Sequence, residues 1–572
     1  MSHNFPSSIL DPRGIQHREL LNLAKRPKLE ALIAGPIVLY NNTKLFHNNY
    51  LAIFERTKEN FIKEGISNFI EFIETPRGKS NQELKAFAMK LARVEPVAAI
   101  VALGDIGVSP ACTIITIELE KLGIPTLYYT APPGTALVKA VANYRSGRLC
   151  IVSLDIYQGS SIEEINAEVD AQWHSVMDSL LLPPGKIENR ANLDFVLDSD
   201  ITGIDKPKDL AERIEVTESS FQEASSGIDE INDLFNELHI SDGLPIIPPT
   251  ERRYQKMLAY CPFDPDAVLA KEIGPSGKDI IVRDVVIAAV MAGCKPEYMP
   301  FLITAFRAMA NEKYNFFQSV TTSHPGGNLV LVSGPLAQQV GLHGGQGCLG
   351  PGFRANLTIG RAVNLTIINV CRSIPGFSDL ANISSQAELT YCFAEDPSIT
   401  PWETMNKERF DAQTSIVYLL KAEPIHDIID FLSPSAESLL ETIVDCSTTL
   451  GSNNAYITGP LLVILTPDHA SLLKREGWDK ARIRKHIHAH AVNDANKLKN
   501  RGINPVRPKG FAEMDFIPVT RGPEDIEIII AGGRGGHSAI ILPWALHSEG
   551  IVERILLPDG TVPRSIEDFR LK

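Results

Sequence analysis

The fold of the first part of the chain is decided by the stretch Val101-Ala-Leu-Gly-Asp-Ile-Gly-Val-Ser-Pro-Ala-Cys112-Thr-Ile-Ile-Thr-Ile-Glu-Leu-Glu-Lys-Leu-Gly-Ile-Pro-Thr126. Its apolar start predicts a buried strand, and the glycines that follow predict a turn. A helix is expected next, because Ser109 is a good N-cap and Pro110 suits the first helical position. A second strand begins at Thr126. This strand–turn–helix–strand unit is typical of a parallel sheet.

Strand and helix patterns alternate on both sides of this stretch. Continuous apolar runs predict strands at 33–40, 68–73, 97–103, 126–130 and 149–154. Helical periodicity predicts helices at 50–64, 81–94, 110–122, 134–145 and 161–181. Apolar runs of this kind belong to sheets covered on both faces, so the fold class is α/β with a doubly wound parallel sheet. Ligands of such sheets bind at the carboxyl ends of the strands, where the Cys112 loop is expected.

The length of 572 residues predicts more than one domain. We expect a lead-in over 1–30, an α/β domain over 31–183, a linker over 184–228 and a larger mixed α/β or α+β domain over 229–572. The linker is inferred from its sparse apolar pattern and its proline and serine content. In the larger domain, the segments 328–335, 461–469 and 526–533 each combine an apolar strand with a polar or glycine turn, which hints at an internal repeat.

Composition excludes several classes of protein. The chain is 44% hydrophobic and 22% charged, as in ordinary globular proteins, and its net charge of −14 comes without a basic block for nucleic acid. No apolar run reaches the roughly 18 residues of a membrane span, and the first residues lack the regions of a signal peptide. The eight cysteines form no CxxC pair. We therefore expect a cytoplasmic protein with reduced thiols and, as is common at this size, a homo-oligomer.

Cys112 is the first candidate for chemistry. It lies three residues after the predicted N-cap, where unpaired backbone N–H groups and the helix dipole favour a thiolate. This position predicts a reactive nucleophile, with an inert small residue as the alternative.

The same segment resembles the cysteine/selenocysteine loop of the UGSC-motif protein family and, more distantly, that of the selenoprotein B subunits of glycine and betaine reductases. The likeness includes the run Glu120-Lys121-Leu122-Gly123-Ile124-Pro125. It places the second family cysteine at Cys112 and the Sec/Cys position at Ser109. Because serine forms neither a selenol nor a disulfide, the two-sulfur couple that the family implies is absent. The second half is similar to the region that accompanies UGSC-type domains, through Val290–Tyr298, Leu349–Arg361, Pro467–Ala470, Glu476–Trp478 and Ala531–Ser538.

A glycine-rich loop at 341–353 is the densest constellation in the second half. Its glycines, among them Gly345, Gly347 and Gly350, are expected to adopt positive φ and to let a ligand approach the backbone. A helix predicted at 353–369 would add free N–H groups and Arg354, which together form an anion site. The loop matches GxGxxG, but no strand leads into it and no acidic residue follows at the dinucleotide spacing. The alternative is a loop needed only for packing.

Further polar groups follow other predicted strands and loops. Arg534 and His537 lie in the loop after the strand at 526–530, where Arg534 would bind substrate and His537 would act as acid or base, or would instead cap a following helix. His343 is a second acid or base candidate, and His324 and Glu395 are weaker ones. The alternating His486, His488 and His490 suit a metal only on a strand, whereas the preceding residues predict a helix, so no metal is expected.

Three functions are compatible with these residues, and no cofactor is specified by them. The first is a reductase-like enzyme in which Cys112 attacks a small carboxylate-bearing substrate held on Arg354 and the glycine loop, in thiol or C–S/C–N chemistry. This function requires a cleft between the two domains. The second is a non-redox lyase or hydratase with its site in the C-terminal domain, and the third is a non-catalytic ligand-binding or assembly protein.

Overall fold

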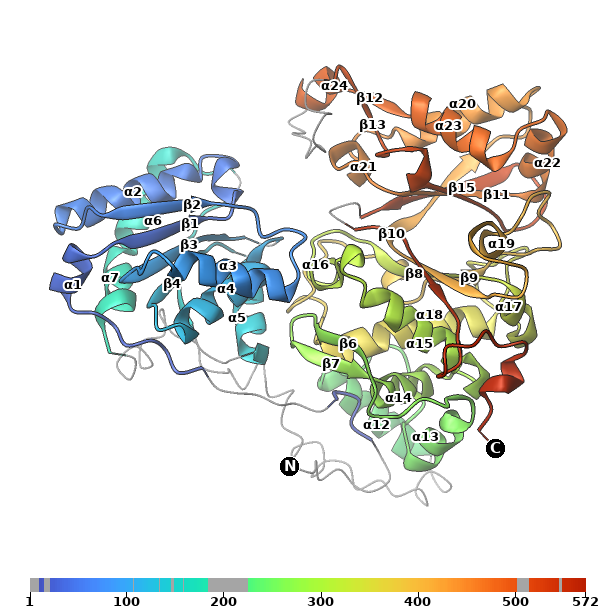
Figure 1. Cartoon of the computed structure of the whole chain (residues 1–572), viewed down its shortest axis with the longest axis horizontal. Coiled ribbons are helices and arrows are strands. Elements are labelled where there is room, and N and C mark those ends of the chain that lie inside the picture. Colours follow the sequence, from blue (N-terminus) through green and yellow to red (C-terminus); the bar gives the residue numbers. More distant parts are fainter. Residues whose placement is uncertain are drawn as a thin grey trace.

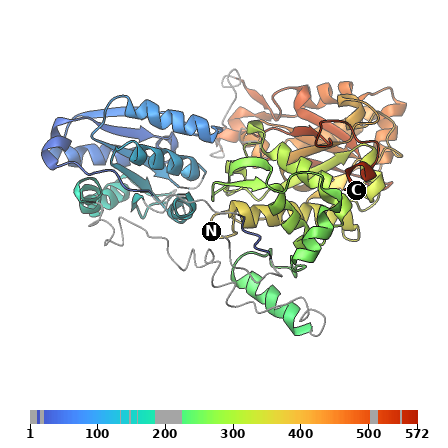
Figure 2. The same ribbon diagram turned by 60° about the horizontal axis from the view of Figure 1, so that its bottom comes forward.

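The computed structural model describes residues 10–14, 21–105, 107–132, 134–145, 149–157, 159–183, 225–500, 514–544 and 548–571. Much of the expected lead-in, and residues 184–224 of the expected linker, lie outside the described residues. Figures 1 and 2 show two bodies, a smaller one in blue and teal and a larger one in green to red. The fold class predicted from the sequence, α/β in both parts, is confirmed.

The smaller body is built on five parallel strands in the order β2-β1-β3-β4-β5. The strands are β1 (Ile37–Asn41), β2 (Phe69–Ile73), β3 (Ala98–Gly104), β4 (Thr126–Thr130) and β5 (Cys150–Ser153). Its helices are α1 (Leu29–Ala34), α2 (Leu51–Lys63), α3 (Asn81–Ala92), α4 (Ser109–Lys121), α5 (Gly134–Arg145), α6 (Ile162–Ala171) and α7 (Trp173–Leu181). Helices α3, α4 and α5 pack side by side, and α2, α6 and α7 form a second group, so the sheet is doubly wound (Figure 1).

Two predicted boundaries in this body are wrong. The strand expected to start at residue 33 starts at Ile37, because α1 occupies the preceding residues and Gly35 and Pro36 then end the helix. The single helix expected at 161–181 is two helices that meet at Gln172.

The larger body contains a mixed sheet in the order β14-β11-β15-β10-β8-β9, with β16 paired to β10. Its strands are β8 (Gly327–Ser333), β9 (Cys392–Ala394), β10 (Ile416–Ile429), β11 (Leu461–Leu465), β14 (Ile526–Ile530), β15 (His537–Pro543) and β16 (Ile551–Arg554). Two strand pairs stand apart from it, β6 (Val268–Ile273) with β7 (Lys278–Ile281) and β12 (Val492–Asp494) with β13 (Phe516–Pro518).

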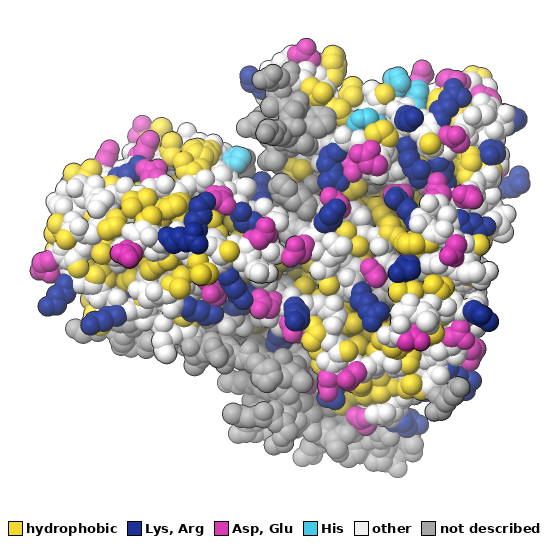
Figure 3. All heavy atoms as spheres, viewed as in Figure 1, with side chains coloured by type: hydrophobic (Ala, Val, Ile, Leu, Met, Phe, Trp, Pro, Cys, Tyr) yellow, Lys and Arg dark blue, Asp and Glu magenta, His cyan; other side chains and the backbone are white. Residues whose placement is uncertain are grey.

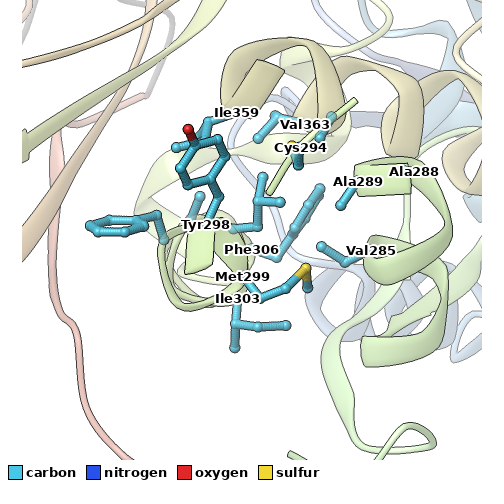
Figure 4. Packing of buried hydrophobic residues seen from close by; sticks show 14 of the residues in the cluster. Val285, Ala288, Ala289, Cys294, Tyr298, Met299, Ile303, Phe306, Ile359 and Val363 are labelled. Carbon is cyan, nitrogen blue, oxygen red and sulfur yellow. The ribbon is translucent and has the colours of Figure 1, made fainter. Parts of the chain in front are cut away.

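The helices of the larger body follow the same chain order. They are α12 (Ser225–Glu237), α13 (Glu251–Met257), α14 (Val282–Ala292), α15 (Met299–Met309), α16 (Phe316–Ser319), α17 (Pro335–Val340), α18 (Arg354–Thr366), α19 (Met405–Arg409), α20 (Ala436–Ser447), α21 (Asn453–Tyr456), α22 (Pro467–Arg475), α23 (Lys480–His490) and α24 (Ala495–Asn500). Figure 4 shows the apolar packing of α14, α15 and α18, where Val285 and Ala289 face Phe306 and Val363. No described helix has the length and apolarity that a membrane span needs.

The sheet of the larger body repeats one topology twice. Strand β8 is parallel to β9 and antiparallel to β10, and β11 is parallel to β14 and antiparallel to β15. Two hydrogen bonds repeat as well, since Glu395 N–H donates to Val332 O at 2.9 Å and Ala531 N–H donates to Leu465 O at 3.2 Å. Of the three segments that suggest the repeat in the sequence, β8 and β11 are equivalent, whereas β14 is the equivalent of β9.

A short segment of the glycine loop joins the two edges of this sheet. His343 O accepts the N–H of Ala394, the last residue of β9, at 3.1 Å, and Gly344 O accepts the N–H of Gly532 after β14, at 2.8 Å. Apolar side chains from β8, β9, β10, β11, β14 and β15 fill the space inside. The loop predicted from its glycines therefore closes a curved sheet, and this places it beside the loop after β14.

The two bodies touch near α3 and the β6–β7 pair. Lys85 lies 3.3 Å from the carboxylate of Glu272, and Asn81 donates to Glu272 O at 3.0 Å. Arg145 donates to Gly274 O at 3.1 Å. On the face shown in Figure 3, side chains of both charge signs are mixed.

Candidate functional site

The two glycine loops predicted separately from the sequence lie against each other. Gly345 and Gly532 form an isolated parallel bridge, next to the hydrogen bond between Gly532 and Gly344. A Cβ at Gly344 would lie 2.3 Å from Ala394 O, so the close approach requires glycine there. Together the loops line a cavity of about 470 Å³.

The cavity has a largely apolar lining, with the exposed side chains of Arg534 and His537 at its rim. Its apolar lining comes from Leu349, Ile425, Ile464, Ala531 and Ala539. Among the predicted site residues, Gly347, Gly350, Arg534 and His537 line it, and Gly345 supports it through the bridge.

The backbone of the glycine loop differs in part from the prediction. Positive φ occurs at Gly341 (76°), Gly347 (75°) and Gly352 (110°) but not at Gly345 or Gly350. Gly345 instead takes part in the bridge to Gly532, for which an extended backbone is suited.

The loop after β14 is held by side chains from the start of α22. Thr466 Oγ1 donates to Gly535 O at 2.9 Å, and Gly535 N–H donates to Asp468 Oδ2 at 2.9 Å. Ser538 Oγ accepts the N–H of Thr466 at 3.1 Å and lies 2.6 Å from Nδ1 of the buried His469. These contacts explain the Pro467–Ala470 motif as a support for the loop.

His537 lies at the rim of the cavity, at the start of strand β15. Its Nδ1 is 3.0 Å from a carboxylate oxygen of Asp427, and its ring meets the ring of Phe431 edge-on at 5.2 Å. Because a strand follows, the alternative that His537 caps a helix is wrong. A carboxylate on Nδ1 holds an imidazole in one orientation and leaves Nε2 for a substrate, which is the arrangement a general base needs.

Arg534 extends into solvent from the same loop. Its side chain is 87% exposed and lies 3.6 Å from Asp468, an arrangement worth little as an ion pair. The guanidinium can therefore turn toward an anion at the mouth of the cavity at small cost.

Cys348 was missed as a candidate because cysteines in long chains are usually buried small residues. It lines the cavity, and burial raises the pKa of its thiol to about 11, although backbone N–H groups of Gly532 and Leu349 oppose the rise. Its position in the middle of a glycine loop could have identified it from the sequence.

Two predicted residues do not line the cavity. The ring of His343 stacks on Phe353 at 3.7 Å, and its Nε2 lies 3.0 Å from Gln346 O. The guanidinium of Arg354 donates twice to Gly293 O, at 3.0 and 2.8 Å. Both side chains thus hold the glycine loop and α18 in place.

Cys112 and Ser109 lie inside the smaller body. Helix α4 begins at Ser109 and Val108 is its N-cap, so the predicted N-cap is wrong by one residue. Cys112 N–H already donates to Val108 O at 3.0 Å, and its thiol receives a hydrogen bond from Asn42 at 3.2 Å. Burial raises the pKa of Cys112 to about 12, which opposes the thiolate expected from the helix position.

The contact between the two bodies does not join Cys112 to the second half. A cavity of about 630 Å³ lies there, lined by residues 78–82, 85, 268–273, 309–312 and 315–317. It contains none of the predicted site residues.

The remaining candidates are held by neighbours. His324 Nε2 lies 3.1 Å from Glu423, and the buried Glu395 accepts hydrogen bonds from Ser333 and Met405. His486, His488 and His490 lie on helix α23, and within the described residues no cluster of three metal-ligating side chains occurs.

A second cavity within the larger body, of about 380 Å³, was not predicted. It lies beside β8, β10 and α18 and contains Lys421, Glu388 and Asp379. Lys421 itself could have indicated this cavity, because it is a charged residue among the buried residues of strand β10.

Comparison of the chain with protein-family models, curated proteins and solved structures gives no match. The resemblance to the UGSC-motif family stays a prediction.

Proposed function

We propose that the chain is an enzyme that acts on a small carboxylate-bearing substrate in the cavity between the two glycine loops. The observation that carries the proposal is the convergence of these loops, which brings the cationic Arg534 and the base candidate His537 to the rim of one apolar cavity. The substrate class is a carboxylate with a short apolar body, since the interior offers aliphatic side chains and the rim offers positive charge.

The chemistry that suits this site is that of a lyase or hydratase. Arg534 would hold the carboxylate, and His537, oriented by Asp427, would take the proton from the carbon next to it. The bond to a hydroxyl on the following carbon then breaks, a C=C bond forms, and the departing oxygen takes up the proton that His537 removed, so that water leaves. The reverse direction adds water across the same bond.

This site is preferred over the Cys112 site because Cys112 is fully buried and its pKa is raised, whereas Arg534 and His537 reach solvent. Reductase-like thiol chemistry would need a second reactive sulfur, and Ser109 occupies that place. A purely ligand-binding protein would use the same cavity without a base.

The test is binding and turnover of a panel of three- to six-carbon carboxylates and their neutral amides by the full chain. We expect calorimetry to detect the carboxylates and not the amides, with binding at least tenfold weaker in Arg534→Gln. The matched control is Arg475→Gln, an exposed arginine at the end of α22 that does not line the cavity. Equal binding of acids and amides would contradict the proposal.

Turnover is followed by the ultraviolet absorbance of the unsaturated acid formed from a 3-hydroxy acid. His537→Gln should lower the rate about 100-fold or more, as expected for loss of a general base. The control His490→Gln changes an exposed histidine on α23 and should leave the rate unchanged. Tight binding without turnover of any acid in the panel would favour the ligand-binding alternative.

A further inference from the structure

The second cavity surrounds a buried lysine. Lys421 lies on strand β10, paired in register with Asn328 of β8, and only 4% of its surface is exposed. Its side chain lines the cavity together with Glu388 and Asp379. A charged ammonium inside a protein is unfavourable unless it is paired closely or gives up its proton.

The two acids face the lysine from another part of the chain. Glu388 lies in the turn before β9 and is hydrogen-bonded by Ser384 Oγ, and Asp379 accepts the N–H of Ala381 at 3.1 Å. Burial lowers the pKa of Lys421, although the two acids oppose the change, and burial raises the pKa of Glu388 to about 7. Burial therefore favours the uncharged forms of both Lys421 and Glu388.

An unpartnered amide marks the same cavity as a ligand site. Asn364, 5% exposed, lines the cavity, and its Oδ1 is held by Asn328 at 3.3 Å while its Nδ2 is buried without a hydrogen-bond partner. Buried donors are normally satisfied, so this one calls for an acceptor from outside the chain. Helix α18 also passes into a π-helical turn at Ile367–Cys371, and such turns are frequent at functional sites.

We propose that this cavity binds a small polar aldehyde or ketone and that Lys421 forms an imine with its carbonyl carbon. The uncharged Nζ attacks the carbon, a C–N bond forms, and the oxygen takes up a proton to give a carbinolamine. Glu388 donates a proton to this hydroxyl, the C–O bond breaks, and water leaves. The first N–H proton of the amine passes to the carbonyl oxygen, and the second passes to the Glu388 carboxylate after water has left, so the imine nitrogen keeps no hydrogen. One water is released per carbonyl consumed, and no electrons are transferred. The Nδ2 group of Asn364 would donate to a polar oxygen of the ligand.

Other charged groups around the cavity do not replace these roles. Asp242 also lines it but is paired with Arg361 at 2.6 Å, and the ring of His239 lies tilted against that of Phe377 at 5.0 Å. Lys480 is as buried as Lys421, at 3% exposed, but its ammonium donates to Glu403 O at 2.7 Å and to Glu408 at 3.0 Å. Lys480 lines neither this cavity nor the one between the glycine loops, so it serves as a matched control.

The experiment is reductive trapping on the full chain. Pyruvate and propanal are added separately at pH 7 with cyanoborohydride, which reduces an imine to a stable secondary amine, and labelled lysines are located by peptide mass spectrometry. We expect Lys421 to be labelled at least tenfold faster than any exposed lysine and Lys480 to stay unlabelled. Labelling rates that increase with the solvent exposure of each lysine would overturn the proposal. So would the absence of a label on Lys421 with either carbonyl compound.

A variant tests the role of the acid without removing the lysine. Glu388→Gln keeps a side chain of the same size, and circular dichroism checks that it folds. Labelling of Lys421 should slow severalfold in this variant, and an unchanged rate would refute the part given to Glu388. Since the trap reports only on Lys421, its failure would leave the carboxylate site between the glycine loops untouched.

Discussion

The alkylation rate of Cys112 distinguishes two expectations, because the sequence predicts a reactive thiolate there, whereas the structure buries this side chain. A helix N-terminus favours a thiolate, but burial in the smaller body opposes it, and the two effects differ in sign. The perturbation is alkylation of the native protein with iodoacetamide over a range of pH, and the readout is the rate for each cysteine by peptide mass spectrometry.

The expected magnitude follows from the pKa. With a pKa of about 12 for Cys112, about one thiol in ten thousand is ionised at pH 8, against about one quarter for a free cysteine. Only the thiolate reacts, so Cys112 should react about a thousandfold more slowly than a free cysteine, and its fully buried sulfur slows it further.

Cys446 is the internal control, because its side chain is partly exposed on α20. We expect Cys446 to be alkylated first and Cys112 only when the chain is unfolded in urea. If native Cys112 reacts faster than Cys446, with a midpoint below about 8.5, then the burial argument fails and the nucleophile hypothesis for the smaller body returns.

Two further predictions concern stability. Glu120 and Arg26 form a pair with no exposed side-chain surface, so Glu120→Gln should lower the free energy of unfolding of the smaller body by about 3–5 kcal/mol in urea titrations. Glu118→Gln changes a partly exposed carboxylate that is paired with Lys121 on the same helix, and it should cost under about 1 kcal/mol; equal effects would contradict this. Burial raises the pKa of Asp284 to about 7, above its unfolded value, so its carboxylate destabilises the fold increasingly as pH rises toward 7. Asp284→Asn keeps an acceptor for Ile281 N–H. This variant should raise the free energy of unfolding by up to about 4 kcal/mol more at pH 8 than at pH 4. A higher free energy of unfolding at pH 4 alone would contradict the direction of the pKa shift.

The smaller body was predictable because its boundaries are set locally. Strand β4 and helix α5 have the bounds expected from the sequence, since Gly123 and Pro125 end the preceding helix and Gly134 opens the next. Continuous apolar runs between such residues leave little choice of element. The sheet of the larger body was predictable only as a mixture, because its closure depends on Gly345 meeting Gly532, which no local pattern specifies.

The candidate site was predictable in its parts and not in its assembly. Glycine content identified both loops, but Arg354, expected to bind an anion, is already bound to Gly293 O. Conversely, Lys421 lies in the buried part of strand β10, and the role proposed for it depends on Glu388, which an intervening loop brings near it. Residue type and spacing identify what a side chain can do, whereas packing decides whether a neighbour has already used that capacity.

The repeated topology explains why the proposed carboxylate site lies where it does. After the parallel pair β8 and β9, Ser333 donates to Glu395 at 2.7 Å and Met405 N–H donates to the same carboxylate at 2.7 Å, so a buried polar network fills that place. After the equivalent pair β11 and β14, Thr466 and Ala531 leave a cavity instead. Carboxyl ends of parallel strands favour ligands in both cases. The sheet therefore supplies the same rigid base twice, and the loops decide which copy stays open to a substrate.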